Sequence, residues 1–185
     1  MNYTRLNDYK NWLKQNLSAE RYEHTLGVAE CAKELARQFN LDEDKAELAG
    51  LIHDCAKCID SNQLRTMINN LPDLCDGELV NHKTYHAPAG VIVAKKEFGI
   101  EDEEILSSIR WHTIGKINMT DFEKVIFIAE RLLSECGIFF THFDYYLFTF
   151  LNEYNKLIKY RDLKQIKGAE LAKLSFLSTG KIFDF

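Results

Sequence analysis

Apolar residues recur at helical spacing along almost the whole chain, and runs of alternating β-branched residues are absent. Proline, which interrupts helices, occurs only twice in 185 residues. A period of 3.6 residues places apolar side chains on one face of a helix, whereas a strand needs a period of two. The sequence therefore predicts an all-α fold of about eight or nine helices. No repeat, low-complexity tract or linker breaks the pattern, so we expect a single domain over residues 1–185.

Apolar stripes and capping residues predict the first four helices. The first helix has its stripe at Leu6, Tyr9, Leu13 and Leu17. Side chains that accept backbone N–H groups at helix starts follow at Ser18, Asp42 and Ser61. These predict helices that end near Phe39, Lys57 and Pro72, respectively. Residues 71–85 are the least periodic part of the chain and are expected to form a loop.

The second half of the chain continues the helical pattern. One helix is expected around Pro88, ending at Gly99, and another from about Asp102 to Trp111. Thr120 with Glu123 predicts a capping box that opens the next helix. Further helices are expected over residues 141–160 and up to residue 177, so that residues 141–180 complete the domain.

Composition limits the classes of partner. The chain is 46% hydrophobic and 28% charged, with a formal net charge of −5, and its charges of both signs are mixed. This argues against a nucleic acid polymer as partner, but not against phosphate beside bound cations. The N-terminus lacks the apolar core of a secretory signal, and the longest apolar stretch, residues 137–151, is too short to span a bilayer. With five cysteines, an odd number, the sequence predicts a cytoplasmic protein with reduced thiols and no membrane contact.

The pair His53-Asp54 stands at the end of an otherwise apolar helical segment. Adjacent imidazole and carboxylate groups can both reach one metal ion where a helix ends or loosens, and the carboxylate can bridge two cations. Three further histidines fall on inward faces or near helix ends, namely His24, His86 and His112. The alternative for each histidine alone is a hydrogen-bonded core residue or a surface residue. Their joint pattern favours a metal site.

The ordered set of these residues resembles the HD-domain metal phosphohydrolases, most closely the bacterial YqeK group of symmetrical diadenosine-tetraphosphate hydrolases. The resembling stretches are Arg21-Tyr-Glu-His24-Thr, Leu51-Ile-His53-Asp54-Cys-Ala-Lys57, His86-Ala-Pro-Ala-Gly90, Phe98-Gly99-Ile100 and His112-Thr113-Ile-Gly115. They cover about residues 18–132. The Ala-Lys ending and the His-Thr-x-Gly step are more discriminating than the His-Asp pair.

The resemblance implies an HD-domain helical bundle with two metal ions, usually iron in this group. One ion would be held by His24, His53, Asp54 and Glu130, and the other by Asp54, His86 and His112. A metal-bridged hydroxide would attack phosphorus and release two ADP from diadenosine tetraphosphate. Nitrogen and oxygen ligands suit Fe, Mn, Mg or Zn, and paired cations lower the pKa of a bound water.

Two basic residues have proposed roles at this site. Lys57 follows His53 by one helical turn and is expected to aim its ammonium at the substrate phosphates, which makes it a catalytic candidate beside Asp54. Arg21 precedes His24 by three residues and is expected to bind phosphate with its guanidinium. The alternative for both is a solvated surface charge.

The chain departs from the family pattern after Ala129. The family has Asp where this chain has Glu130, and it continues with a Glu-Pro-x-Arg stretch that is missing here. Glu can still bind metal, although its carboxylate lies one methylene further from the backbone. Two alternative functions therefore stay open: an HD phosphohydrolase acting on another nucleotide or phosphate ester, and a metal-bound nucleotide sensor without turnover.

The sequence has two further features, a cysteine pair and an aromatic tract. Cys55 and Cys58 have the spacing of redox or zinc sites, but the βαβ context and a second ligand pair are both missing. Residues 138–150 carry seven aromatic side chains, which we interpret as core with part of them covering a homodimer contact.

Overall fold

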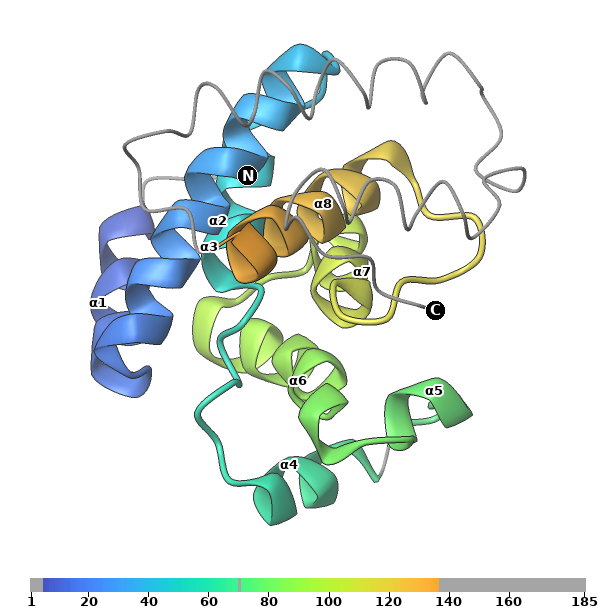
Figure 1. Ribbon diagram of the computed structural model, residues 1–185. Helices are drawn as coiled ribbons and strands as arrows, with labels where there is room; N and C mark the ends of the chain where they lie inside the picture. Colours follow the sequence, from blue (N-terminus) through green and yellow to red (C-terminus); the bar gives the residue numbers. More distant parts are fainter. Residues whose placement is uncertain (1–4, 70, 137–185) are drawn as a thin grey trace. The chain divides into compact units, whose positions relative to one another are not determined.

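The computed structural model describes residues 5–69 and 71–136 of the chain (Figure 1). Within these residues there are eight α-helices and no strand, which confirms the all-α prediction. The helices are α1 (Leu6–Asn16), α2 (Ala19–Gln38), α3 (Glu43–Ile52), α4 (Ser61–Ile68), α5 (Asp76–Leu79), α6 (His86–Phe98), α7 (Glu103–Trp111) and α8 (Asp121–Cys136). A 3₁₀ helix, η2, spans His82–Thr84.

The chain divides into two compact units, residues 1–130 and 131–185. The first unit contains α1 to α7 and most of α8. The helices expected between residues 141 and 180, and the aromatic residues 138–150, lie outside the described residues. A single domain over residues 1–185 therefore stays a prediction.

Local capping determines where most helices begin. The side chains of Ser18, Asp42 and Asp102 each accept a backbone N–H from the first turn that follows. Thr120 and Glu123 form a reciprocal capping box, with N–H to side-chain oxygen distances of 3.2 and 2.8 Å. These caps satisfy amide groups that have no partner inside the helix, and they confirm the predicted starts.

The predicted end of the third helix is wrong. The helix was expected to reach Lys57, but α3 ends at Ile52. The chain then continues in turns closed by i to i+3 hydrogen bonds, such as Lys57 N–H to Asp54 O at 2.9 Å. Such turns are tighter than those of an α-helix, and the side chains of His53 and Asp54 both reach one cluster of potential metal ligands.

Three smaller expectations also need correction. Asp60, rather than Ser61, caps α4, because its carboxylate accepts the N–H groups of Asn62 and Gln63. That helix ends at Ile68, before the expected boundary near Pro72. The segment 71–85, expected to be a loop, contains α5 and η2. Both are too short to give a periodic apolar pattern.

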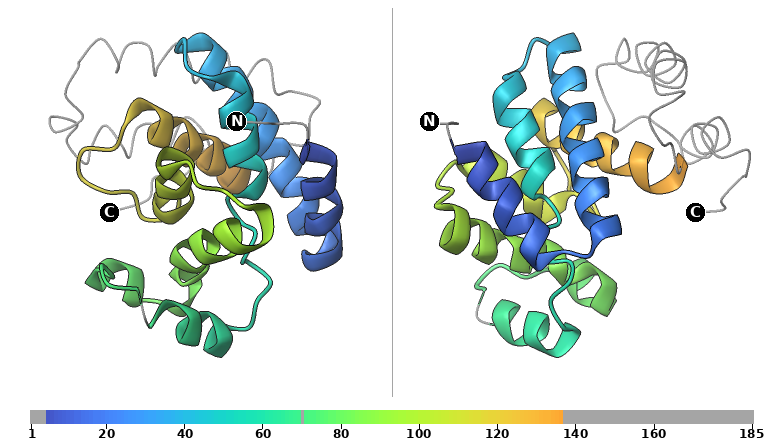
Figure 2. Two further views of the ribbon diagram at one scale, coloured as in Figure 1. Left: turned by 180° about the vertical axis from the view of Figure 1, so that it is seen from behind. Right: turned by 90° about the vertical axis from the view of Figure 1, so that its left-hand side faces the viewer.

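Close packing of α2 on α3 brings two predicted site residues, His24 and His53, together. Gly50 of α3 lies against α2, where a Cβ atom would be 2.9 Å from Ala29 Cα and from Val28 O. Only glycine fits this approach without moving backbone. Helices α1, α2 and α3 stand side by side (Figure 2), α6 packs along α7, and α3 contacts α7. His24 on α2 therefore faces the end of α3.

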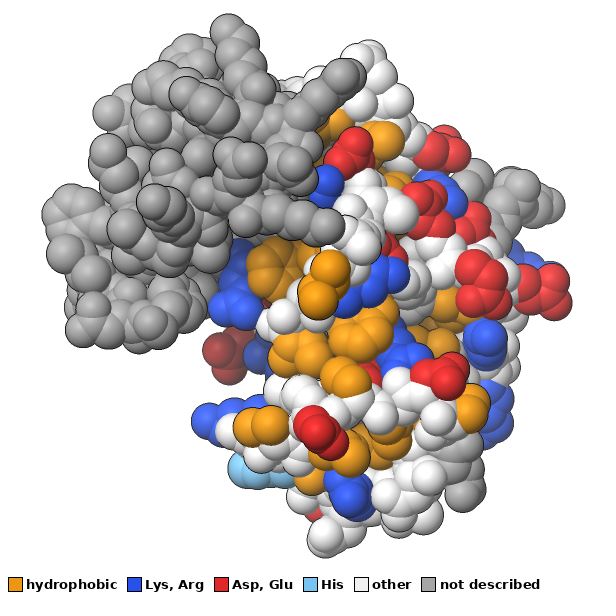
Figure 3. Space-filling view, turned by 90° about the vertical axis from the view of Figure 1, so that its right-hand side faces the viewer, with side chains coloured by type: hydrophobic (Ala, Val, Ile, Leu, Met, Phe, Trp, Pro, Cys, Tyr) orange, Lys and Arg blue, Asp and Glu red, His pale blue; other side chains and the backbone are white. Residues whose placement is uncertain are grey.

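The surface of the described residues agrees with the mixed charge of the sequence. Figure 3 shows acidic and basic side chains interspersed over one face, with hydrophobic side chains between them. Among the described helices, none combines the length and the apolarity that a bilayer crossing requires.

Candidate metal centre

His53 and Asp54 lie at the end of α3, and both are completely buried. The Nδ1–H of His53 donates to the carbonyl of Gly50 at 2.6 Å. A carbonyl oxygen can only accept, so Nδ1 carries a proton. The other ring nitrogen, Nε2, therefore points into the centre.

The same arrangement recurs at two more histidines. His86 Nδ1 donates to Lys83 O at 2.7 Å, and His112 Nδ1 donates to Ile109 O at 2.6 Å. In each case the acceptor lies three residues before the histidine. Metal-bound histidines commonly donate their second ring nitrogen to a carbonyl or carboxylate, which fixes the tautomer and the ring orientation.

Asp54, His86 and His112 form a compact set that we call the buried group, and all three side chains are at most 3% exposed. Asp54 Oδ1 lies 3.0 Å from His86 Nε2 and 3.3 Å from His112 Nε2, and these two nitrogens are 3.2 Å apart. Ligands bound at right angles to one metal ion, at the usual bond length near 2.1 Å, lie about 3 Å from one another. The buried group fits one cation.

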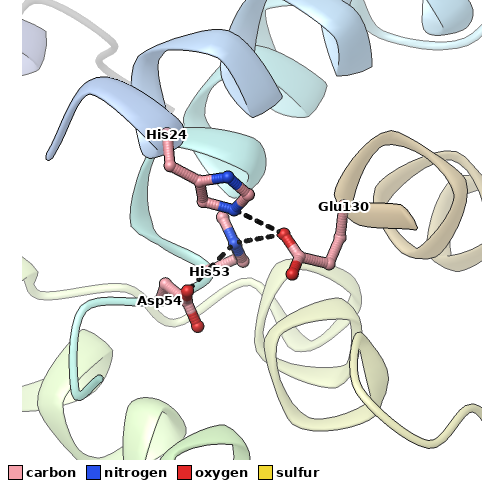
Figure 4. A group of neighbouring side chains, drawn as sticks. All are labelled: His24, His53, Asp54 and Glu130. Atoms are coloured by element: carbon pink, nitrogen blue, oxygen red, sulfur yellow. Dashed lines mark hydrogen bonds and ion pairs between the residues drawn. The ribbon is translucent and has the colours of Figure 1, made fainter. Parts of the chain in front are cut away.

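His24, His53, Asp54 and Glu130 form a second set, the outer group (Figure 4). Glu130 Oε2 lies 2.7 Å from His24 Nε2 and 3.1 Å from His53 Nε2. His53 Nε2 is 3.7 Å from Asp54 Oδ2. The side chains of His24 and Glu130 are 14% and 13% exposed, so this group reaches the edge of the core. Asp54 is common to both groups and offers one oxygen to each.

Two buried atoms of the centre have no hydrogen-bond partner among the described residues, His53 Nε2 and Asp54 Oδ1. Both lie within ion-pair distance of neighbouring ligand atoms, but these contacts lack hydrogen-bond geometry. An unsatisfied buried polar atom costs about 1–3 kcal/mol. A cation bound between the ligands would satisfy both atoms, and the nitrogen and oxygen donors suit Fe, Mn, Mg or Zn.

The electrostatics keep both carboxylates ionised. Burial opposes the charged form of Asp54, but the neighbouring His53 and the contacts from His112 and His86 hold its pKa well below the usual value. Burial likewise opposes the charge on Glu130, while its histidine partners lower its pKa. Burial lowers the pKa of His112 and outweighs the attraction of Asp54. The carboxylates and the imidazole of His112 are thus in the forms that bind metal, whereas the pKa of His53 is raised, because the effect of its burial is outweighed by Asp54 and Glu130.

Arg21 and Lys57 both reach this centre. Arg21 Nη1 donates to Asp54 Oδ2 at 2.9 Å. Lys57 Nζ lies 3.1 Å from His86 Nε2 and 3.9 Å from Asp54 Oδ1. Burial lowers the pKa of Lys57 and Arg21 lowers it further, although Asp54 acts in the opposite direction. Neither residue is a solvated surface charge.

The cysteine pair lies beside this centre but is not arranged as a site. Cys55 is buried, and burial raises the pKa of its thiol. Cys58 is exposed, and both cysteines are free. Within residues 5–69 and 71–136, neither belongs to a group of metal-binding side chains.

Comparison with known proteins assigns the fold to a family. The sequence profile of the HD domain matches residues 21–135, a stretch that contains every residue of both groups. The chain belongs to the HD domain family. The HD domain implies binding of divalent metal, in agreement with the two ligand groups.

Named relatives share this HD domain. The symmetrical bis(5'-nucleosyl)-tetraphosphatase of Halalkalibacterium halodurans is 43% identical over 120 residues, which are 65% of this chain and 64% of that protein. The protein of the same name from Bacillus subtilis is 40% identical over 122 residues, with coverage of 65% and 64%. The match therefore spans less than two thirds of these curated relatives.

A solved structure is also similar to this HD domain. It is an HD superfamily hydrolase from Clostridium acetobutylicum, described as involved in NAD metabolism. The two chains are 34% identical, the TM-score is 0.66, and the match covers 85% of this chain and 89% of the other.

Proposed function

We propose that this HD domain hydrolyses dinucleoside polyphosphates and cleaves diadenosine tetraphosphate symmetrically into two ADP. The observation that carries the proposal is the pair of ligand groups joined through Asp54. Two adjacent cations suit a substrate whose reacting centre lies inside a chain of four phosphates. The names of the relatives that are 40–43% identical support the same substrate.

In this proposal the outer group and the buried group each hold one ion, with iron as the expected metal. Bound there, the ions would supply Lewis acidity, activate water and screen the polyphosphate charge. Asp54 would set the spacing of the two sites, because its oxygens face different groups. The carbonyl-oriented His53, His86 and His112 would keep their Nε2 atoms aimed at the centre.

Arg21 and Lys57 would bind and orient the polyphosphate. Their side chains are 30% and 31% exposed, so each reaches from the solvent edge to Asp54. A phosphate oxygen arriving at this edge could take over the hydrogen bond that Arg21 now gives to Asp54. Lys57 would place its ammonium beside the reacting phosphate and stabilise the negative charge that develops there.

Product analysis of the purified full chain tests the proposal. The protein is prepared without chelator, its metal content is measured, and it is supplied with Fe²⁺ or Mn²⁺ and diadenosine tetraphosphate. ADP as the only nucleotide product, with one to two equivalents of metal, is the expected result. AMP plus ATP would overturn symmetrical cleavage. Less than about a tenth of an equivalent of metal, with no rebinding, would overturn the metal centre.

A second candidate is hydrolysis of another nucleotide, because the similar structure from Clostridium acetobutylicum is described as involved in NAD metabolism. Dinucleotides of the NAD type and mononucleotides therefore belong in the same assay panel. Tight binding of nucleotide without turnover would favour the sensor hypothesis. Cytoplasmic location and a homodimer stay predictions, and light scattering on the purified protein tests the second.

A further inference from the structure

A buried carboxylate outside the two ligand groups joins α7, α8 and the loop between them. The side chain of Glu123 is 2% exposed. Its Oε2 accepts the N–H of Thr120 at 2.8 Å, and its Oε1 contacts Lys116 Nζ at 2.6 Å and accepts the hydroxyl of Ser107. Lys116 Nζ also donates to Ser107 Oγ at 2.9 Å. We call Ser107, Lys116 and Glu123 the clamp.

The clamp residues lie close in sequence to two predicted ligands, His112 and Glu130. Ser107 precedes His112 by five residues on α7, and Lys116 follows His112 by four in the loop. Glu123 precedes Glu130 by seven residues on α8. Seven residues are nearly two helical turns, so residues at this spacing lie within about 20° of each other around the axis. One contact set therefore connects the part of α7 that ends at His112 with the face of α8 that carries Glu130.

Loop geometry explains how Lys116 returns to the clamp. The N–H of Gly115 bonds to Trp111 O at 2.9 Å, and Gly115 has a φ of +68°. This left-handed residue follows the turn after α7 and redirects the chain, in a conformation that glycine adopts without steric cost. Lys116 is the next residue. The His112-Thr113-Ile114-Gly115 step thus contains a ligand and the turn that leads to the clamp.

We propose that the clamp is a positioning device that sets the spacing of α7 and α8, so that His112 and Glu130 can serve two adjacent metal ions. The inference rests on the proposed function. His112 belongs to the buried group and Glu130 to the outer group, and Asp54 is the only residue common to both. The clamp provides a second connection between the groups, through α7, α8 and the loop between them.

Lys116→Met in the full chain tests the clamp, with Mn²⁺ as the probe. The parent is expected to bind two Mn²⁺ ions that are close enough to give a spin-coupled electron paramagnetic resonance spectrum. The variant leaves Glu123 without its cation and is expected to bind Mn²⁺ about 10-fold more weakly, the scale of losses at residues that support ligands. The coupled signal per bound ion is expected to fall as well, which a mere loss of stability would not cause.

Matched variants separate the possible causes. Lys116→Arg keeps the charge and is expected to restore affinity and coupling. Lys124→Met removes an exposed ion pair on the same helix, between Lys124 Nζ and Asp121 Oδ1 at 2.7 Å. This control is expected to change neither the Mn²⁺ affinity nor the spin coupling. Ser107→Ala weakens the clamp without removing a charge, and it decides the question if Lys116→Met does not fold.

Two results would overturn the inference in distinguishable ways. The clamp alone is overturned if the parent binds two ions and the Lys116→Met variant has the affinity and spin coupling of the parent. If Lys116→Met fails to fold, the same result with Ser107→Ala overturns the clamp. A parent that binds no Mn²⁺ overturns the proposed function and the clamp together.

Discussion

The buried group and the outer group share Asp54 but differ in how firmly their ligands are held. In the buried group, His86 and His112 are oriented by main-chain carbonyls, and the ligand atoms lie 3.0–3.3 Å apart. In the outer group the corresponding distances range from 2.7 to 3.7 Å, and two side chains reach the solvent edge. Rigid ligands favour one coordination geometry, whereas ligands at an edge can adjust.

This difference bears on Glu130, the position where the family resemblance predicts Asp. Glu130 is in the outer group, and its side chain is 13% exposed. A longer carboxylate side chain at an edge can move outward to absorb its extra methylene. In the buried group, the same change would force close-packed neighbours apart.

The largest effect is expected where the two groups meet. Asp54→Ala should release both ions and lower hydrolysis by at least about 10³-fold, because it removes the ligand common to both. Metal analysis, turnover and circular dichroism are measured together. A variant that keeps its metal and its activity would show that Asp54 has only a structural role.

Single histidine variants compare the groups directly. His112→Ala should lower the affinity of the buried group for its metal ion by about 100-fold, whereas His24→Ala should lower the affinity of the outer group by about 10-fold. Water can replace the imidazole of His24 at the solvent edge, but His112 is only 1% exposed. Titration of both variants with Mn²⁺ measures the two losses. Equal losses would contradict the distinction between a rigid and an adjustable group.

Glu130 tests the adjustable group alone. Glu130→Ala should lower metal affinity by about 10-fold, and Glu130→Asp should restore it. The competing possibility is that water fills this position at no cost. In that case Glu130→Ala would bind metal as tightly as the parent, and the sensor hypothesis would gain support.

The last effect concerns the stability of the support of the buried group, rather than metal binding, and depends on pH. Glu78 accepts two hydrogen bonds from Arg110 of α7, at 2.7 and 2.9 Å. Its carbonyl accepts the hydroxyl of Thr84, next to Lys83, whose carbonyl orients His86. Burial opposes the charge of Glu78, but the bonds from Arg110 and from the N–H of Cys75 lower its pKa below 4.5.

The lowered pKa of Glu78 in the folded state determines how its contribution to stability depends on pH. The stabilisation is complete above pH 4.5, the usual value, and is lost as the pH falls through the lower folded value. Glu78→Gln should therefore reduce the free energy of unfolding at pH 7 by about 1.5–3 kcal/mol, and by less in acid. Urea denaturation of both proteins with chelator, from pH 7 to pH 3, measures the difference. Parallel pH curves would contradict this assignment.

Sequence patterns predicted the features that depend on nearby residues. The caps at Ser18 and Asp42 could be predicted because each acts within one turn of its own helix. The predicted site histidines stand out in the sequence because they fall on inward faces of helices or near helix ends. The family resemblance grouped the predicted ligands. Their side chains do lie close together, although residues such as His24 and Glu130 are 106 positions apart in the sequence.

Other features could not be predicted because they depend on tertiary contacts. The end of α3 at Ile52 could not be predicted, since the apolar pattern continues through Cys55 and Ala56 while the backbone changes to i to i+3 turns. The contact of Arg21 with Asp54 links positions 33 apart in the sequence. Glu123 was recognised as a cap, but its contact with Lys116 depends on the change of chain direction at Gly115.

The hydrogen bonds from Nδ1 have a consequence for sequence change and for protein design. Each orienting acceptor is a main-chain oxygen three residues upstream, at Gly50, Lys83 or Ile109. Every amino acid supplies that oxygen, so a mutation that preserves the turn leaves the imidazole aimed as before. A histidine and its preceding three residues thus form a transferable unit. Designers could place this unit at a turn of another helical scaffold without adding a supporting side chain.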